Sequence, residues 1–302
     1  MLFKELGSTG VLIPEVGIGT WSYHAGPGPI RKGLNVGARF IDTAESYGSE
    51  PVVAKAIAGQ RDCVFLATKV SRDHFRRADV LKAADNSLRN LGADHIDLYQ
   101  LHEPNAAIPV DETLGAMEEL VDAGKVRFIG VSNFSLPQLQ AAQRALRKHR
   151  IVSNQVRFNL TDRTINGQLL PYCQANRITI IAYSPLAREF QRVLECDPRG
   201  VLAGMAGATG RTPAQIALNW CLCRDGVVVI PKSNSASHLV ENCGASDWRL
   251  DAEQVQQLDD AILSRRRGSF ETFFRRFLPP TIKKHIQRLV KLSPRALRHR
   301  ID

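Results

Sequence analysis

Val64-Phe65-Leu66-Ala67-Thr68-Lys69 and Ile96-Asp97-Leu98-Tyr99-Gln100-Leu101-His102 are two short apolar runs, and an amphipathic segment at 79–92 lies between them. Short runs that are almost continuously apolar predict strands buried on both faces. The intervening segment opens on Asp79, a helix-capping residue type, and closes on Gly92, which can take the left-handed conformation. The stretch therefore predicts a parallel strand-helix-strand unit.

The same alternation recurs along the chain. We predict eight strands, at residues 16–19, 40–42, 64–68, 96–101, 126–131, 152–155, 178–183 and 227–230. Among the helical patterns between them, segment 111–124 repeats the design of an initial Asp and a final Gly, and Thr212-Pro213 predicts another helix start. Eight buried strands separated by helices predict an α/β fold whose parallel sheet closes into a (β/α)8 TIM barrel.

An open, doubly wound sheet is the alternative architecture. Such sheets often hold a dinucleotide on a GxGxxG turn after the first strand, but Gly17-Ile18-Gly19-Thr20-Trp21 lacks the third glycine. Ahead of this segment, Gly7-Ser8-Thr9-Gly10 separates two short apolar stretches, which predicts an N-terminal β-hairpin at the barrel floor. The barrel is therefore favoured.

The excess positive charge is concentrated at the C-terminal end. Residues 265–302 hold 12 Lys and Arg against two acids, and the totals of 40 and 30 then leave 28 of each sign in residues 1–264. Apolar residues recur at helical spacing among these bases, which predicts a basic amphipathic C-terminal helical extension beside a catalytic barrel domain at 1–264. We expect the extension to dock on the barrel or on a partner subunit, with peripheral membrane contact as the alternative.

Several classes of protein are not supported. No nucleic-acid partner is expected, because the tail shows charge without base-reading groups. The sequence has no export signal and no membrane-spanning run, so we expect a cytoplasmic protein, with monomer and homo-oligomer both compatible. The six cysteines contain no CxxC pair, and no metal site is predicted.

Four polar side chains lie at or just past the ends of predicted strands: Asp42, Tyr47, Lys69 and His102. The carboxyl ends of barrel strands face one mouth, so these side chains are expected to converge. A lysine ammonium beside a tyrosine favours the tyrosinate, a carboxylate keeps that lysine charged, and a histidine can donate to a carbonyl. The set suits protonation of a carbonyl oxygen, for which a nicotinamide cofactor would supply the hydride.

Six ordered motifs in residues 1 to about 264 resemble the aldo-keto reductases. They are Phe40-Ile41-Asp42-Thr43-Ala44-Glu45-Ser46-Tyr47-Gly48, Ala67-Thr68-Lys69, Leu101-His102, Gly130-Val131-Ser132-Asn133-Phe134, Ala182-Tyr183-Ser184-Pro185-Leu186 and Ile230-Pro231-Lys232-Ser233.

This resemblance implies a role for each matching residue. Tyr47 is then the general acid, Lys69 and Asp42 tune it, and His102 orients the substrate. The implied cofactor is NADPH. Its implied contacts are Thr20, then Ser132, Asn133, Gln155 and Tyr183 at the nicotinamide, Ser184 and Leu186 at the pyrophosphate, Lys232, Ser233, Ser235 and His238 at the phosphate, and Glu241 and Asn242 at the adenine.

Some positions depart from the family's pattern. His238 stands where the family often has an arginine that pairs with the 2′-phosphate, so NADH is the alternative cofactor. Arg157 and Phe158 stand where Glu and Tyr are frequent. Trp21 and Glu103 are expected to line the substrate pocket, Glu103 in favour of polar substrates.

Two functions from different classes are predicted. The first is NAD(P)H-dependent reduction of an aldehyde or ketone to an alcohol, with Tyr47 as proton donor. The second is a nucleotide-bound sensor or regulatory subunit of the same fold with negligible turnover. The four polar residues favour the enzyme.

Overall fold

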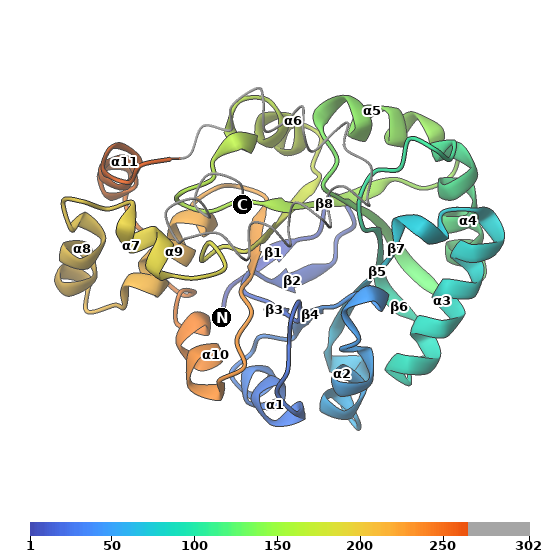
Figure 1. Cartoon of the computed structure of the whole chain (residues 1–302), viewed down its shortest axis with the longest axis horizontal. Helices are drawn as coiled ribbons and strands as arrows, with labels where there is room; N and C mark the ends of the chain where they lie inside the picture. Colours follow the sequence, from blue (N-terminus) through green and yellow to red (C-terminus); the bar gives the residue numbers. More distant parts are fainter. Residues whose placement is uncertain (265–302) are drawn as a thin grey trace, which may run out of the picture. The chain divides into compact units, whose positions relative to one another are not determined.

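The computed structural model describes residues 1–264, and the predicted basic extension lies outside the described residues. Within this part of the chain, strands occupy the centre and helices surround them (Figure 1). One sheet of eight strands forms the centre, in the order β10-β9-β8-β7-β6-β5-β4-β3, and every neighbouring pair is parallel. The strands are β3 (Ile18–Gly19), β4 (Phe40–Asp42), β5 (Phe65–Val70), β6 (Ile96–Leu101), β7 (Val126–Ser132), β8 (Ile151–Arg157), β9 (Thr179–Tyr183) and β10 (Val227–Ile230).

The first and last strands meet and close the sheet. Val16 forms a parallel bridge with Val229, and the Gly19 amide donates to the Pro231 carbonyl at 3.1 Å. A side chain on Gly19 would not fit here, because its Cβ would lie 2.6 Å from the Ile230 carbonyl oxygen. These contacts confirm the predicted (β/α)8 barrel.

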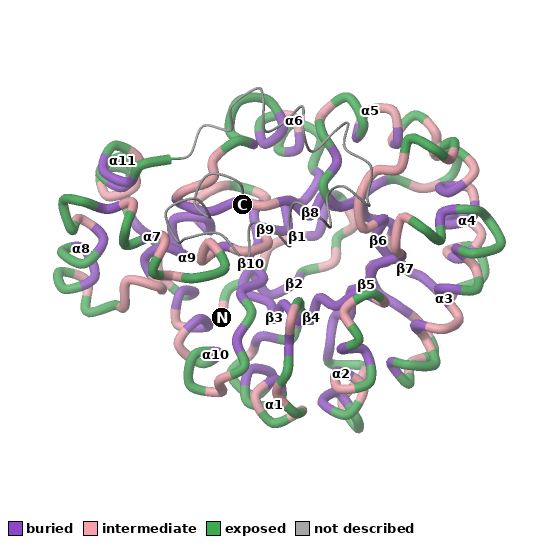
Figure 2. The backbone as a smooth tube through the Cα atoms, in the orientation of Figure 1, coloured by how far each residue is buried: buried purple, intermediate pink, exposed green. Residues whose placement is uncertain are grey.

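The helices cover the outside of the barrel. Their barrel-facing residues and the strands are buried, whereas their outer faces are exposed (Figure 2). Within residues 1–264, no helix combines the length and hydropathy that a membrane span requires. The helices are α1 (Pro27–Asn35), α2 (Glu50–Ile57), α3 (Arg77–Leu91), α4 (Val110–Asp122), α5 (Leu136–Ala145), α6 (Leu169–Ala175), α7 (Gln191–Glu195), α8 (Val201–Thr209), α9 (Pro213–Leu222), α10 (Ala236–Cys243) and α11 (Ala252–Ala261).

The predicted N-terminal hairpin is present and plugs one end of the barrel. Strands β1 (Phe3–Glu5) and β2 (Leu12–Pro14) pair antiparallel. Leu6 and Ile13 are fully buried and pack with residues of the barrel strands. The Gly7 amide donates to Thr179 Oγ1 at 2.7 Å, and Thr179 begins β9. The hairpin therefore lies at the amino ends of the strands and leaves the opposite mouth open.

Two predicted helix starts are wrong, and one is confirmed. α3 begins at Arg77, two residues before Asp79, and its first amide donates to the Glu112 carboxylate of α4 at 3.2 Å. A neighbouring helix thus supplies the cap. Asp111 likewise lies in the first turn of α4, where a carboxylate still favours the helix dipole. Thr212 caps α9 as predicted, and accepts from the Gln215 amide at 3.2 Å.

The hydroxyl of Tyr99 is a buried group whose removal we expect to stabilise the fold. Tyr99 lies on β6, is 0% exposed, and its Oη has no hydrogen-bond partner among the described residues. An unsatisfied buried hydroxyl costs free energy, so Tyr99→Phe is expected to raise the free energy of unfolding by about 1–2 kcal/mol. Urea denaturation followed by circular dichroism measures this. A loss of stability would show that the hydroxyl has a partner.

Candidate active site

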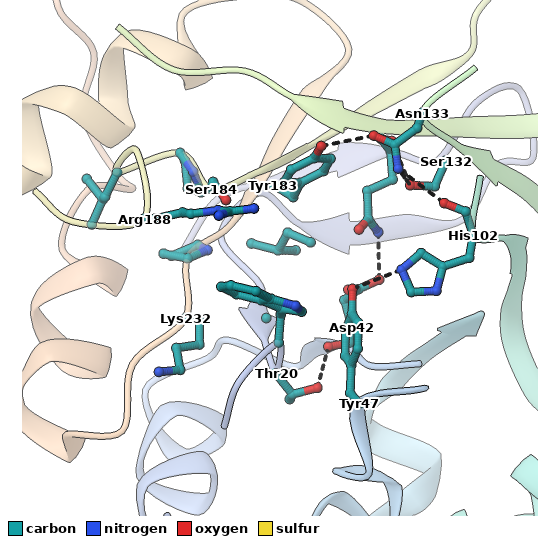
Figure 3. Close-up of a pocket in the computed structure, with 17 residues that line it drawn as sticks. Thr20, Asp42, Tyr47, His102, Ser132, Asn133, Tyr183, Ser184, Arg188 and Lys232 are labelled. Carbon is teal, nitrogen blue, oxygen red and sulfur yellow. Dashed lines mark hydrogen bonds between the residues drawn. The ribbon is translucent and has the colours of Figure 1, made fainter. Parts of the chain in front are cut away.

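Consecutive strands bring the four predicted polar residues to one mouth of the barrel. Asp42 ends β4, Lys69 lies near the end of β5, His102 follows β6, and Tyr47 lies on a 3-10 turn after β4. The Tyr47 hydroxyl lies 3.5 Å from Lys69 Nζ and 3.4 Å from His102 Nε2. Figure 3 shows the Tyr47 and His102 side chains directed at each other. The hydroxyl is therefore the point at which the set converges.

A buried ion pair between Lys69 and Asp42 lies next to the Tyr47 hydroxyl. Lys69 Nζ lies 2.6 Å from Asp42 Oδ2, with the two side chains 0% and 3% exposed. Lys69 also donates to the Thr43 carbonyl at 2.8 Å. The second carboxylate oxygen, Asp42 Oδ1, accepts from Gln155 Nε2 at 2.7 Å and from Gln100 Nε2 at 3.1 Å. The pair is thus held in one geometry by surrounding hydrogen bonds.

This environment keeps the tyrosine protonated. Burial raises the pKa of Tyr47 above its usual value, the Lys69 charge opposes that shift, and Asp42 adds to it. Lys69 acts to lower the pKa of Tyr47, as predicted, but burial raises that pKa by more. Burial alone would lower the pKa of Lys69, but Asp42 and Tyr47 outweigh it and hold that pKa above its usual value. At neutral pH the site therefore contains a neutral phenol beside an ammonium, which suits proton donation.

His102 is a neutral imidazole at physiological pH. Burial, with a smaller effect of the Lys69 charge, lowers the pKa of His102 from 6.5 to about 4. Its ring meets that of Tyr47 edge to face, with centroids 5.4 Å apart, and its backbone carbonyl accepts from Asn133 Nδ2 at 3.1 Å. A neutral imidazole can donate a hydrogen bond to a substrate oxygen without competing as an acid.

The low pKa of His102 predicts a level pH profile. Because the charged imidazole forms only as pH falls through about 4, we expect its NMR signals to stay constant at neutral pH and to shift only on acidification. Reductive kcat/KM is expected to stay level from about pH 6 to about pH 8 and to decline towards lower pH. An inflection near 6.5 that disappears in His102→Gln would contradict this assignment.

A cavity of about 270 Å³ extends from Tyr47 across the mouth. Of the residues predicted to act in catalysis, cofactor binding or substrate binding, it brings together Thr20, Trp21, Asp42, Tyr47, His102, Ser132, Asn133, Gln155, Tyr183, Ser184, Leu186 and Lys232. Lys69 lies behind this lining, against Asp42 and Tyr47.

Polar side chains and one aromatic ring lie side by side on one wall. Tyr183 Oη donates to Asn133 Oδ1 at 2.9 Å, and Asn133 Nδ2 donates to Ser132 Oγ at 3.1 Å. Asn133 has a φ of 62°, a left-handed conformation that asparagine tolerates better than most residues. Ser132 Oγ in turn donates to the Gln155 carbonyl at 2.9 Å. These contacts hold the Tyr183 ring across the mouth (Figure 3).

The predicted phosphate-binding residues lie around the start of α10. Lys232 lines the cavity away from Tyr47 and His102, and burial lowers its pKa. Ser235 is the residue before α10, and its amide donates to Ser233 Oγ at 3.0 Å. His238 is exposed on the first turns of the helix. Further along α10 are Glu241, which is half-buried, and Asn242, which is buried. None of these residues except Lys232 lines the cavity.

The two predicted substrate residues have different positions. Trp21 lines the cavity and is 48% exposed. Glu103 is not among the lining residues, and its carboxylate lies 3.4 Å from Arg72 Nη1.

Sequence reasoning missed Arg188 and Gln100. Arg188 lines the cavity with its guanidinium 4.9 Å from the Trp21 ring centroid, in a loop that no motif identifies. Its φ of 68° follows one of 56° at Ala187, so the loop carries two consecutive left-handed residues that are not glycine. Gln100 interrupts an apolar strand, and that interruption is the sequence signal for its place in the site.

The closed barrel and the proton-handling group at its open mouth define a (β/α)8 protein with its site at the carboxyl ends of the strands. A sequence model described as the Aldo/keto reductase family matches residues 16–263. Methylglyoxal reductase YeaE of Escherichia coli strain K12 is 34% identical over 261 residues, which cover 83% of this chain and 92% of that protein.

Solved structures agree with the sequence comparison. An aldo/keto reductase from Klebsiella pneumoniae in complex with NADP and acetate has a TM-score of 0.82 and 38% identity, over 88% of this chain and 97% of that one. The aldo-keto reductase Tm1743 in complex with the inhibitor epalrestat has a TM-score of 0.81 and 39% identity, over 86% and 100%. The chain belongs to the aldo/keto reductase family.

Proposed function

We propose that this protein reduces a small aldehyde or ketone to an alcohol with NADPH, and that Tyr47 donates the proton. The observation that carries the proposal is the convergence of Lys69 and His102 on the Tyr47 hydroxyl at one end of a cavity. The relatives include a methylglyoxal reductase and a structure in complex with NADP, which support the reaction class.

The cavity wall fits a nicotinamide. Asn133 Oδ1 accepts one hydrogen bond, from Tyr183, and a carbonyl oxygen can accept a second, from a carboxamide NH₂. Ser132 and Gln155 offer further polar atoms, and the Tyr183 ring offers an apolar face. When bound, the cofactor supplies the hydride that the protein's own side chains lack. We assign Thr20, Ser184 and Leu186, which line the same cavity, to the remaining length of the cofactor.

The protein's part in the reaction is proton transfer. His102 and Tyr47 orient the substrate oxygen, and Tyr47 passes its proton to that oxygen as negative charge develops there. The Lys69 ammonium, 3.5 Å away, then stabilises the tyrosinate. Asp42 keeps Lys69 charged throughout. We assign Trp21 to the substrate wall, whereas Glu103 is paired with Arg72 and is not among the residues that line the cavity.

Lys232 is proposed to read the cofactor phosphate together with Ser233, Ser235 and His238, while Glu241 and Asn242 contact the adenine. Loss of one charged contact to a phosphate is worth about 1.5–3 kcal/mol, so Lys232→Met is expected to raise the KM for NADPH roughly tenfold or more. The KM for NADH should change little. The KM for NADPH and the KM for NADH are measured for the wild type, for Lys232→Met and for the control variant Lys55→Met on α2. Equal losses for NADH and NADPH would remove Lys232 from the phosphate site.

A panel of small aldehydes tests the proposal as a whole. We expect oxidation of NADPH, followed at its near-ultraviolet absorbance, to depend on the added carbonyl compound. The second candidate function, a nucleotide-bound sensor or regulatory subunit, predicts tight cofactor binding with no turnover on any member. That result would overturn the reductase.

A further inference from the structure

The ring of Tyr183 lies beside both the cavity and a positive charge. Arg157 and Tyr183 are register partners at the ends of β8 and β9. The Arg157 guanidinium carbon lies 5.9 Å from the Tyr183 ring centroid. Tyr183 lines the cavity and Arg157 does not. The aromatic ring therefore lines the cavity and also has a cation close to it.

Arg157 has no carboxylate partner among the described residues. No ion pair within residues 1–264 involves Arg157, and its Nε is buried with no hydrogen-bond partner in that part of the chain. The arginines beside the Trp220 ring differ in this respect, since Arg163 and Arg224 both pair with Asp259 at 3.0 Å. In this part of the chain, no carboxylate therefore offsets the charge of Arg157 beside its aromatic neighbour.

A cation beside an aromatic ring changes what the opposite face of the ring attracts. It draws π-electron density towards itself and leaves the other face less negative. It also repels any second cation that stacks on that face. The oxidised nicotinamide ring carries a positive charge, whereas the reduced ring is neutral. Arg157 is therefore expected to repel the oxidised form of the cofactor more strongly than the reduced form.

We propose that Arg157 is a positioning residue that acts through Tyr183 and makes the protein bind the reduced nicotinamide cofactor in preference to the oxidised one. This rests on the proposed function, in which the nicotinamide meets Tyr183. Weaker binding of the oxidised form speeds its release after each reduction and lessens its competition with NADPH for the site. Arg157 thereby limits inhibition by the oxidised cofactor without contact with the reacting atoms.

A charge series at this position tests the proposal. The dissociation constants of NADPH and NADP⁺ are measured by equilibrium dialysis for the wild type, Arg157→Lys, Arg157→Gln and Arg157→Glu. Their ratio, NADP⁺ over NADPH, is expected to stay near the wild-type value in Arg157→Lys. It is expected to fall about threefold to tenfold in Arg157→Gln and further in Arg157→Glu. The fall arises from tighter binding of NADP⁺.

A packing defect gives a different pattern, because it weakens both forms alike and does not follow the sign of the charge. Arg211→Gln is the matched control: its guanidinium carbon lies 5.1 Å from the Trp248 ring and it does not line the cavity. This variant is expected to keep the wild-type ratio. An equal ratio across the series overturns the role of Arg157 while cofactor binding stands. Failure of the wild type to bind either form overturns the proposed function and this inference together.

Discussion

Tyr47→Phe is expected to lower kcat for carbonyl reduction about 10²- to 10⁴-fold, because it removes the proton donor on which the site converges. Lys69 and His102 lie 3.5 and 3.4 Å from the hydroxyl that is lost. The phenyl ring fills the same space, so the dissociation constant of NADPH should remain close to that of the wild type. Single-turnover kinetics with saturating NADPH separate the chemical step from cofactor binding.

Tyr99→Phe is the matched control for this experiment. It removes the same atom from a buried tyrosine on β6. Tyr99, however, packs in a hydrophobic cluster formed by strand and helix residues, and it does not line the cavity. Its turnover should equal that of the wild type. If Tyr47→Phe retained more than about a tenth of the wild-type kcat, another group would have to donate the proton, since general acid catalysis contributes more than that.

Much of the site can be predicted because strand ends are local features of the sequence. The observed bounds of β4 and β6 match the predicted ones. These bounds place Asp42 and His102 at the carboxyl ends of the strands, at the mouth of the barrel. Lys69 was predicted to follow its strand, yet β5 runs on to Val70. A charged residue normally ends a buried strand, but Asp42, 27 positions earlier, compensates its charge inside the barrel.

What the sequence cannot show is which side chains meet across strands. Gln100 and Gln155 both bond to Asp42, at separations of 58 and 113 positions. The approach of Arg157 to Tyr183 likewise depends on the register of β8 against β9, which no local pattern specifies. The helix starts at Asp79 and Asp111 failed for a related reason, because for α3 a carboxylate from another helix caps the first turn.

Asp42→Asn is expected to destabilise the fold by about 3–5 kcal/mol, because it leaves the Lys69 ammonium buried without its counter-ion. In the wild type the pKa of Lys69 is held above its usual value, so the stability due to this pair is present at neutral pH and is lost only as pH rises through that raised pKa. In the variant the pKa of Lys69 should fall below that of the unfolded chain. The free energy of unfolding, measured in urea, should then rise with pH, opposite to the wild-type trend.

The double variant Asp42→Asn/Lys69→Met separates stability from catalysis. With no charge left in the barrel, most of the lost stability should return, since replacing both members of a buried pair is often nearly neutral. Turnover should stay low, because nothing then stabilises the tyrosinate of Tyr47. If stability and activity returned together, the charge of Lys69 would not be required for catalysis. If stability stayed low, the Asp42 bonds to Gln100 and Gln155 would outweigh the ion pair in holding the mouth together.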